Sequence, residues 1–342
     1  MVVYQPSDKV AAYFRVLSPS FPDWLHDYIN TAPLLKQHYI SVTCGTIYTD
    51  LFDSKFFYSS LDHSVAVALI IWHFTHDRRQ TLSGLFHDIA TPAFKHCVDF
   101  LNGDYLRQES TESLTTTLIK ESKAIMRLLK RDQIKLEEID NYHLYPIADN
   151  DTPKLSADRL EYSLSNALFR YHLLNLAEVK TIYRDLSIQK NSDHEIELGF
   201  KTESTALKFV EATSVMSVIY RDDRFRYSMQ FIADILKRLH EDQLIVGDDL
   251  YHLKESEVID LIGKSKYHDI FETWQRAKEI KVSPTPPDDV YSVHCAAKVR
   301  YINPLFAGQR LADINQSAKA AITRNLAYKM DNYCYLDFDF PA

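Results

Sequence analysis

Apolar residues recur at three- and four-residue spacing along most of the chain, and few glycines interrupt them. This pattern is typical of amphipathic helices and predicts a mostly helical protein. Between His63 and Arg79 the apolar residues cover nearly the whole circumference of the expected helix, so we expect this segment to be buried at the centre of the fold. The predicted helices span residues 63–79, 81–90, 93–102, 109–131, 154–170, 173–187, 204–221, 226–246, 255–262 and 266–280.

The few segments that alternate like strands lie towards the end of the sequence. Residues 291–302 and 333–340 show this alternation and are predicted to form a small sheet. They follow residues 281–290, KVSPTPPDDV, in which three prolines oppose helix and sheet alike. The sequence therefore predicts a linker at this position.

A second break in the helical pattern falls near the middle of the chain. Residues 190–199, KNSDHEIELG, interrupt the helical spacing, and no internal repeat is apparent elsewhere. We therefore predict an all-α fold in two parts. These parts are a helical core over residues 1–190 and a mainly helical C-terminal lobe, with a few short strands, over residues 191–342.

The composition disfavours several classes of protein. The 342 residues include 39 Lys+Arg and 47 Asp+Glu, and the formal charge of −8 argues against the broad basic surface of a nucleic-acid binder. No run of about 18 uncharged apolar residues appears, as a membrane-spanning helix would need. The opening MVVYQPSDKV also lacks the basic and apolar parts of a signal peptide. We therefore expect a soluble, cytoplasmic protein with no membrane partner.

The chain has too few glycines for the loops that commonly hold phosphate groups. It contains only seven, and neither GxxxxGK[ST] nor GxGxxG occurs. Such loops bind phosphate through exposed backbone N–H groups. Any phosphate chemistry in this protein must therefore rely on a metal ion and on side chains.

Four residues are candidates for a metal site: His63, the adjacent pair His87 and Asp88, and Asp158. Two imidazoles and two carboxylates can hold one face of a cation and leave the other face for water and substrate. Adjacent residues on a helix point about 100° apart. His87 and Asp88 can therefore reach one ion if it lies beside the end of their helix, with His63 and Asp158 contributed by neighbouring helices.

The sequences around these residues resemble the HD-domain metal-dependent phosphohydrolases. SSLDHSVAVA is followed about 20 residues later by GLFHDIATPAFKH and about 70 residues after that by SADRLEY, which reproduces the family's H…HD…D order. HDIATPAFKH, ADRLEYSLSNA and the later AKVRYINPLF are most similar to the deoxynucleoside triphosphate triphosphohydrolase branch. The resemblance covers roughly residues 20–310, is strongest between 57 and 170, and implies an HD-domain helical core.

The resemblance implies that His63, His87, Asp88 and Asp158 bind one divalent metal ion, with Asp88 also taking part in catalysis. Mixed nitrogen and oxygen ligands suit Mn²⁺, Fe²⁺, Ni²⁺ or Zn²⁺. Mg²⁺ is less favoured because two of the four ligands are imidazoles.

The same comparison assigns roles to residues that follow the metal ligands. His96 matches the last histidine of the HD segment, and Asp99, on the same helix face, can orient His96 and favour its charged form. The pair suits a general acid that protonates a leaving oxygen, or a cation that grips phosphate. Arg159 and Tyr162 match a basic residue and a tyrosine that contact phosphate and sugar, although Tyr162 could also be a core aromatic.

The chain departs from the family pattern at three positions. The family's arginine three residues before the first ligand is Ser60, and the histidine of its Gly-His pair is Thr91. The histidine of a following His-Glu pair is Gln108, with Glu109 retained. We expect Thr91, Gln108 and Glu109 to contact the substrate, but Thr91 and Gln108 cannot transfer a proton near neutral pH.

Structural roles are alternatives for several of these residues. His96 and Asp99 could form only a helix pair, and Arg159 could belong to a surface salt bridge. Lys298 and Arg300, in the late AKVRYINPLF segment, could reach the phosphates or an allosteric nucleotide, or could serve only the fold.

The resemblance implies a phosphohydrolase that splits deoxynucleoside triphosphates to nucleoside and triphosphate and assembles as a homo-oligomer. A nucleotidase, or a phosphomonoesterase for another phosphate ester, is the nearest enzymatic alternative. The three departures also allow a catalytically weak nucleotide sensor that keeps the fold and the metal. A nucleic-acid nuclease or binder is disfavoured by the charge of −8.

Overall fold

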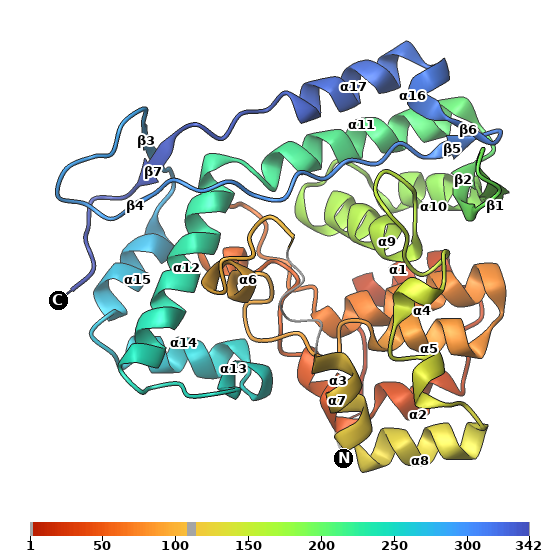
Figure 1. The fold of residues 1–342 in the computed structure, drawn as a ribbon, viewed down its shortest axis with the longest axis horizontal. Helices are drawn as coiled ribbons and strands as arrows, with labels where there is room; N and C mark the ends of the chain where they lie inside the picture. Colours follow the sequence, from red (N-terminus) through yellow and green to blue (C-terminus); the bar gives the residue numbers. More distant parts are fainter. Residues whose placement is uncertain (1–2, 108–113, 342) are drawn as a thin grey trace.

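The computed structural model describes residues 3–107 and 114–341 and has a mostly helical fold (Figure 1). The first half contains α1 (Asp8–Leu17), α2 (Leu25–Ile29), α3 (Ala32–Gln37), α4 (Ser60–Thr75), α5 (Arg78–Phe86), α6 (Cys97–Leu101), α7 (Thr115–Glu121), α8 (Lys123–Asp132), α9 (Ala157–Ser165) and α10 (Leu176–Arg184). The second half contains α11 (Glu203–Ile219), α12 (Asp223–Glu241), α13 (Asp249–His252), α14 (Glu255–Gly263), α15 (His268–Arg276), α16 (Leu311–Ile314) and α17 (Gln316–Leu326).

Two small sheets accompany the helices. The first has the strand order β1-β2-β5-β6 and the second the order β3-β7-β4. The strands are β1 (Leu186–Lys190), β2 (Ile196–Phe200), β3 (Lys281–Ser283), β4 (Ser292–Val293), β5 (Leu305–Phe306), β6 (Gln309–Arg310) and β7 (Tyr333–Tyr335). Between β4 and β5 the chain is extended and crosses the molecule alongside α11 (Figure 1).

The central helix α4 is fixed at its start and buried along most of its length. Ser59 caps it by accepting a hydrogen bond from the Asp62 N–H, while the Asp62 carboxylate accepts one from the Ser59 N–H. The helix packs between α5 and α9 (Figure 1). Gly84 lets α5 approach closely, because a Cβ there would collide with Ile71 Cδ1. This packing brings the start of α4 beside the end of α5.

The core consists of two clusters of buried apolar side chains. One combines residues such as Val65 and Leu164 with Phe209 of α11. The other combines Phe94 with Trp274 and further residues of α12, α14 and α15. Both clusters contain residues from before and after residue 190. The division of the chain into two parts at that residue stays a prediction.

The structure confirms a mostly helical protein with a few short strands, but it corrects several predicted elements. The helix expected over 93–102 begins only at Cys97, because Phe94 and Lys95 have left-handed φ angles of 64° and 46°. The helix expected over 109–131 is divided at Ser122, whose side chain caps α8. Residues 109–113 of that prediction lie outside the described residues.

The strand predictions also needed correction. The expected break at 190–199 contains the turn and most of the second strand of an antiparallel hairpin, in which Leu186–Lys190 pairs with Ile196–Phe200. Three of the expected linker residues form β3. The strand expected over 291–302 is limited to β4. Further along this segment, the Arg300 carbonyl oxygen accepts hydrogen bonds from Ser217 of α11 and Asn325 of α17 rather than from a neighbouring strand. No helix in the described part of the chain is long and apolar enough to span a membrane.

Candidate metal centre

Three helices bring the four predicted metal ligands together. His63 lies in the first turn of α4, His87 and Asp88 follow α5 directly, and Asp158 lies in the first turn of α9, which Ser156 caps. The two Nε2 atoms of His63 and His87 are 3.2 Å apart. Asp158 Oδ1 is 3.2 Å from the first and 3.7 Å from the second, and each Nε2 is 3.8 Å from an oxygen of Asp88. His63, His87 and Asp88 each place a ligand atom within 4.8 Å of the other two, so one ion can contact these three side chains, and Asp158 lies beside the two histidines.

Hydrogen bonds at the opposite ring nitrogens turn both Nε2 atoms towards this cluster. His87 Nδ1 donates to the Gly84 carbonyl oxygen at 2.7 Å, which places the proton on Nδ1. His63 Nδ1 is paired with the carboxylate of Glu161. Metal-binding histidines commonly have such a partner, since it fixes the ring and its tautomer. With both Nδ1 atoms committed, the two Nε2 lone pairs and the two carboxylates form a donor set that fits a divalent cation.

The charges at the site have clear physical causes. Burial lowers the pKa of His63, but Glu161 and Asp158 outweigh it and raise the pKa to about 10. Burial raises the pKa of Asp158, but the hydrogen bond with His63 and the charge of His87 bring it to about 2. Asp88 is also ionised, because Lys95 and the two histidines hold its pKa well below the usual range despite burial. A cation at this site therefore competes with a proton for His63.

The sequence patterns missed two charged residues at the site, Glu161 and Lys95. Glu161 is fully buried, accepts a hydrogen bond from the Tyr58 hydroxyl at 2.7 Å and pairs with His63. It follows Asp158 by three residues on α9, and this helical spacing could have revealed it. Lys95 Nζ lies 2.7 Å from Asp88 Oδ2. It lies in an irregular turn for which no spacing rule predicts an orientation.

We use the term metal cluster for the side chains of His63, His87, Asp88 and Asp158. These side chains line a cavity of about 440 Å³. His96 lines this cavity, and its Nδ1 donates to the buried Asp99 carboxylate at 2.8 Å. Thr91 does not line the cavity, and its carbonyl oxygen accepts a hydrogen bond from Lys36. The two remaining predicted substrate contacts, Gln108 and Glu109, lie outside the described residues.

Arg159 and Tyr162 both line the cavity. The Arg159 guanidinium donates to the Asn150 side chain at 2.6 Å and lies 3.6 Å from Asp149, so the loop before α9 holds it. Asp149 also accepts a hydrogen bond from His143 Nδ1 at 2.8 Å. His143 lines the same cavity and is a histidine that the sequence spacing did not connect with the site.

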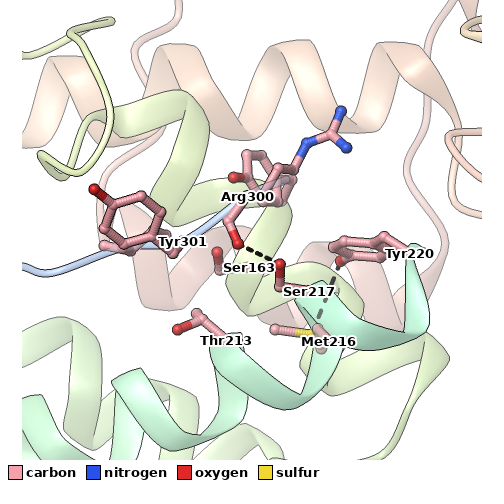
Figure 2. Close-up of a pocket in the computed structure, with 9 residues that line it drawn as sticks. Ser163, Thr213, Met216, Ser217, Tyr220, Arg300 and Tyr301 are labelled. Atoms are coloured by element: carbon pink, nitrogen blue, oxygen red, sulfur yellow. Dashed lines mark hydrogen bonds between the residues drawn. The ribbon is translucent and has the colours of Figure 1, made fainter. Parts of the chain in front are cut away.

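Residues 298–301, which we call the strap, also line the cavity and belong to the extended segment before β5. The Arg300 carbonyl oxygen accepts hydrogen bonds from Ser217 of α11 and Asn325 of α17. A second, small pocket shares Tyr162 and Arg300 with the lining of the cavity. Figure 2 shows the Arg300 carbonyl turned towards Ser217 and the Arg300 guanidinium turned away from this small pocket. Lys298 and Arg300, the two basic residues of the late motif, thus reach the cavity that holds the metal cluster.

Comparison with known proteins places this fold among solved structures. The chain has a TM-score of 0.59 with a hypothetical protein from Aquifex aeolicus, at 16% identity over 98% of this chain and 97% of the other. It has a TM-score of 0.56 with a phosphohydrolase from Bacteroides thetaiotaomicron, at 12% identity over 92% and 96% of the two chains. The fold is shared with a phosphohydrolase.

Sequence comparison adds a relative without a described activity. The chain is 24% identical over 261 residues to the uncharacterized protein YdhJ of Bacillus subtilis, which covers 74% of this chain and 76% of YdhJ. No protein-family model matches the chain. The structural likeness therefore establishes a fold, while the chemistry has to be argued from the side chains of this chain.

Proposed function

We propose that this protein is an HD-domain, metal-dependent phosphohydrolase that acts on nucleotides, foremost on deoxynucleoside triphosphates, which it splits to nucleoside and triphosphate. The observation that carries the proposal is the cluster of His63, His87 and Asp88, with Asp158 beside the two histidines, at a cavity that basic side chains also line. The shared fold with a phosphohydrolase supports the same reaction class.

The chain's own residues divide the work of the reaction. When bound by the four ligands, a divalent cation polarises a phosphoryl oxygen and lowers the pKa of a water molecule. Glu161 and the Gly84 carbonyl hold the two imidazoles in place for that ion. The nitrogen and oxygen donors suit Mn²⁺, Fe²⁺, Ni²⁺ or Zn²⁺ better than Mg²⁺.

His96 is the proposed proton donor. Its Nδ1–H is held by buried Asp99, which leaves Nε2 for the reacting groups. As a water oxygen forms a bond to phosphorus and releases a proton to solvent, the bond from phosphorus to the leaving oxygen breaks, and His96 Nε2–H gives its proton to that oxygen and is then reprotonated from solvent. Asp99 orients the ring throughout this step.

The cavity has the size of a small-molecule site, and basic as well as acidic side chains line it. Its volume of about 440 Å³ lies within the range of small-molecule sites, roughly 300–1,000 Å³. Arg159, next to Asp158 in the sequence, lines the cavity, and so do Lys298 and Arg300 of the strap. These groups can balance the phosphate charge, and Tyr162 can pack against the sugar. We also propose that Gln108 and Glu109, at the positions of the His-Glu pair of the resembling enzymes, contact the substrate.

The position of Thr91 favours a second candidate, a nucleotidase or phosphomonoesterase. Thr91 replaces an imidazole of the resembling enzymes and does not line the cavity. The site therefore offers fewer groups for a long triphosphate than those enzymes do. A nucleotide sensor with little turnover is the corresponding nonenzymatic candidate. A homo-oligomeric assembly and a cytoplasmic location stay predictions.

The proposal is tested by loading the protein with Mn²⁺, incubating it with a panel of nucleotides and identifying the products by mass. We expect triphosphate and nucleoside from deoxynucleoside triphosphates, whereas stepwise phosphate release would favour the nucleotidase. Asp88→Asn should abolish turnover. Asp337→Asn, which removes a surface partner of Lys281, serves as the control. Nucleotide binding in calorimetry without any product would favour the sensor.

A further inference from the structure

Lys95 has an unusual position for a lysine, because it is buried beside the metal cluster and faces the same cavity. Its side chain is only 9% exposed. Its Nζ lies 2.7 Å from Asp88 Oδ2 and 3.4 Å from the Ser60 hydroxyl. Buried lysines are rare unless they are paired, and here the charged partner is itself a proposed metal ligand.

When a cation also binds Asp88, this pairing no longer fully compensates the charge of the Lys95 ammonium group. A metal ion withdraws negative charge from the carboxylate and repels the ammonium group. Asp88 and Ser60 account for two of the three N–H donors of Lys95. An anion in the cavity would accept the third N–H and offset the repulsion between the two cations.

We propose that Lys95 binds the phosphoryl group of the substrate next to the metal ion. The inference rests on the proposed function, since it places the phosphoryl group between the metal cluster and the Lys95 ammonium. Lys95 competes electrostatically with the metal for Asp88, and it joins the metal in holding phosphate. Its removal should therefore change the two affinities in opposite directions.

Calorimetry on Lys95→Met tests this proposal with two probes, Mn²⁺ alone and inorganic phosphate at saturating Mn²⁺. We expect Mn²⁺ to bind more tightly than to the unaltered protein, because a competing positive charge is gone. We expect phosphate to bind at least about tenfold more weakly, as is typical for the loss of a hydrogen bond to a charged group. Lys95→Arg keeps the charge and should retain part of the phosphate affinity.

The matched control is Lys208→Met, which removes an ion-paired lysine that does not line the cavity. Thermal unfolding of all variants establishes that they are folded. Unchanged phosphate affinity in Lys95→Met, or Mn²⁺ and phosphate affinities that fall together, would overturn the proposal, because either result indicates a purely structural lysine. If the unaltered protein binds no Mn²⁺ or hydrolyses no nucleotide, the proposed function itself fails.

Discussion

The metal cluster and the strap line the same cavity, but they are held in different ways. The cluster side chains are fixed by second partners, such as Glu161 behind His63 and the Gly84 carbonyl behind His87. The strap is fixed through its main chain, since Ser217 and Asn325 both bond to the Arg300 carbonyl oxygen. The difference is that the cluster side chains themselves are held in place, as a metal site would need, whereas the carbonyl contact holds only the backbone of the strap and not its basic side chains.

Loss of a metal ligand should have the largest effect and should separate the two regions most clearly. Asp158→Asn removes a negative charge from the oxygen that lies nearest both Nε2 atoms. We expect Mn²⁺ affinity to fall by more than about 100-fold and turnover to be lost, which exceeds the usual effect of removing an outer partner. Calorimetry with Mn²⁺ measures this change. Asp140→Asn, which changes a partner of Thr116 away from the site, is the control, and equal affinities for both variants would contradict a metal role.

A smaller effect is expected when a partner behind the cluster is changed. Glu161→Gln preserves the shape of the side chain but removes the charge that holds His63 Nδ1. Outer-shell changes of this type commonly weaken metal binding by about 10- to 100-fold. The same calorimetric titration tests it, together with thermal unfolding because Glu161 is buried. A folded variant with undiminished Mn²⁺ affinity would show that the cluster does not depend on this support.

The pH dependence of metal binding should report on His63. Its pKa of about 10 means that the imidazole is protonated at neutral pH, and a metal ion must displace that proton. Lowering the pH below this pKa favours the proton, so Mn²⁺ affinity should fall by about tenfold for each pH unit between about 8 and 6. Calorimetry in buffers of different ionisation enthalpy counts the proton released. Binding without proton release would contradict this description of His63.

The strap should respond most weakly. Ser217→Ala removes one of two side-chain hydrogen bonds to the Arg300 carbonyl oxygen. A single hydrogen bond contributes about 1 kcal/mol, so we expect KM for the nucleotide to rise by about fivefold. Steady-state kinetics at saturating Mn²⁺ should give an unchanged kcat. A large loss of metal binding in this variant would show that the strap and the cluster are not separate in function.

The proximity of His63, His87, Asp88 and Asp158 could be predicted from the sequence because each belongs to a short block with a regular helical context, while their role as metal ligands stays a prediction. His63 lies in the first turn of a strongly apolar helix, and His87 and Asp88 directly follow the next one, so local spacing was informative. Lys95 and His143 could not be found in this way. Lys95 lies in a left-handed turn, and His143 lies in an irregular segment whose Tyr142 ring packs against His87, and neither feature leaves a periodic pattern in the sequence.

The wall of the cavity was only partly predictable for a similar reason. The alternation over residues 291–302 suggested a strand, yet only Ser292–Val293 pairs with a neighbour. The Arg300 carbonyl bonds to helix side chains instead, and those partners lie 83 and 25 residues away in sequence. Such distant contacts leave no periodic pattern. The hairpin of β1 and β2 was missed because its polar turn obscured two short strands.

The most direct test of the metal centre is anomalous X-ray diffraction from crystals of the protein grown with Mn²⁺. We expect a single strong peak of anomalous density that contacts His63, His87, Asp88 and Asp158. A peak at other side chains, or no peak at these four in crystals that contain Mn²⁺, would contradict the proposed metal site.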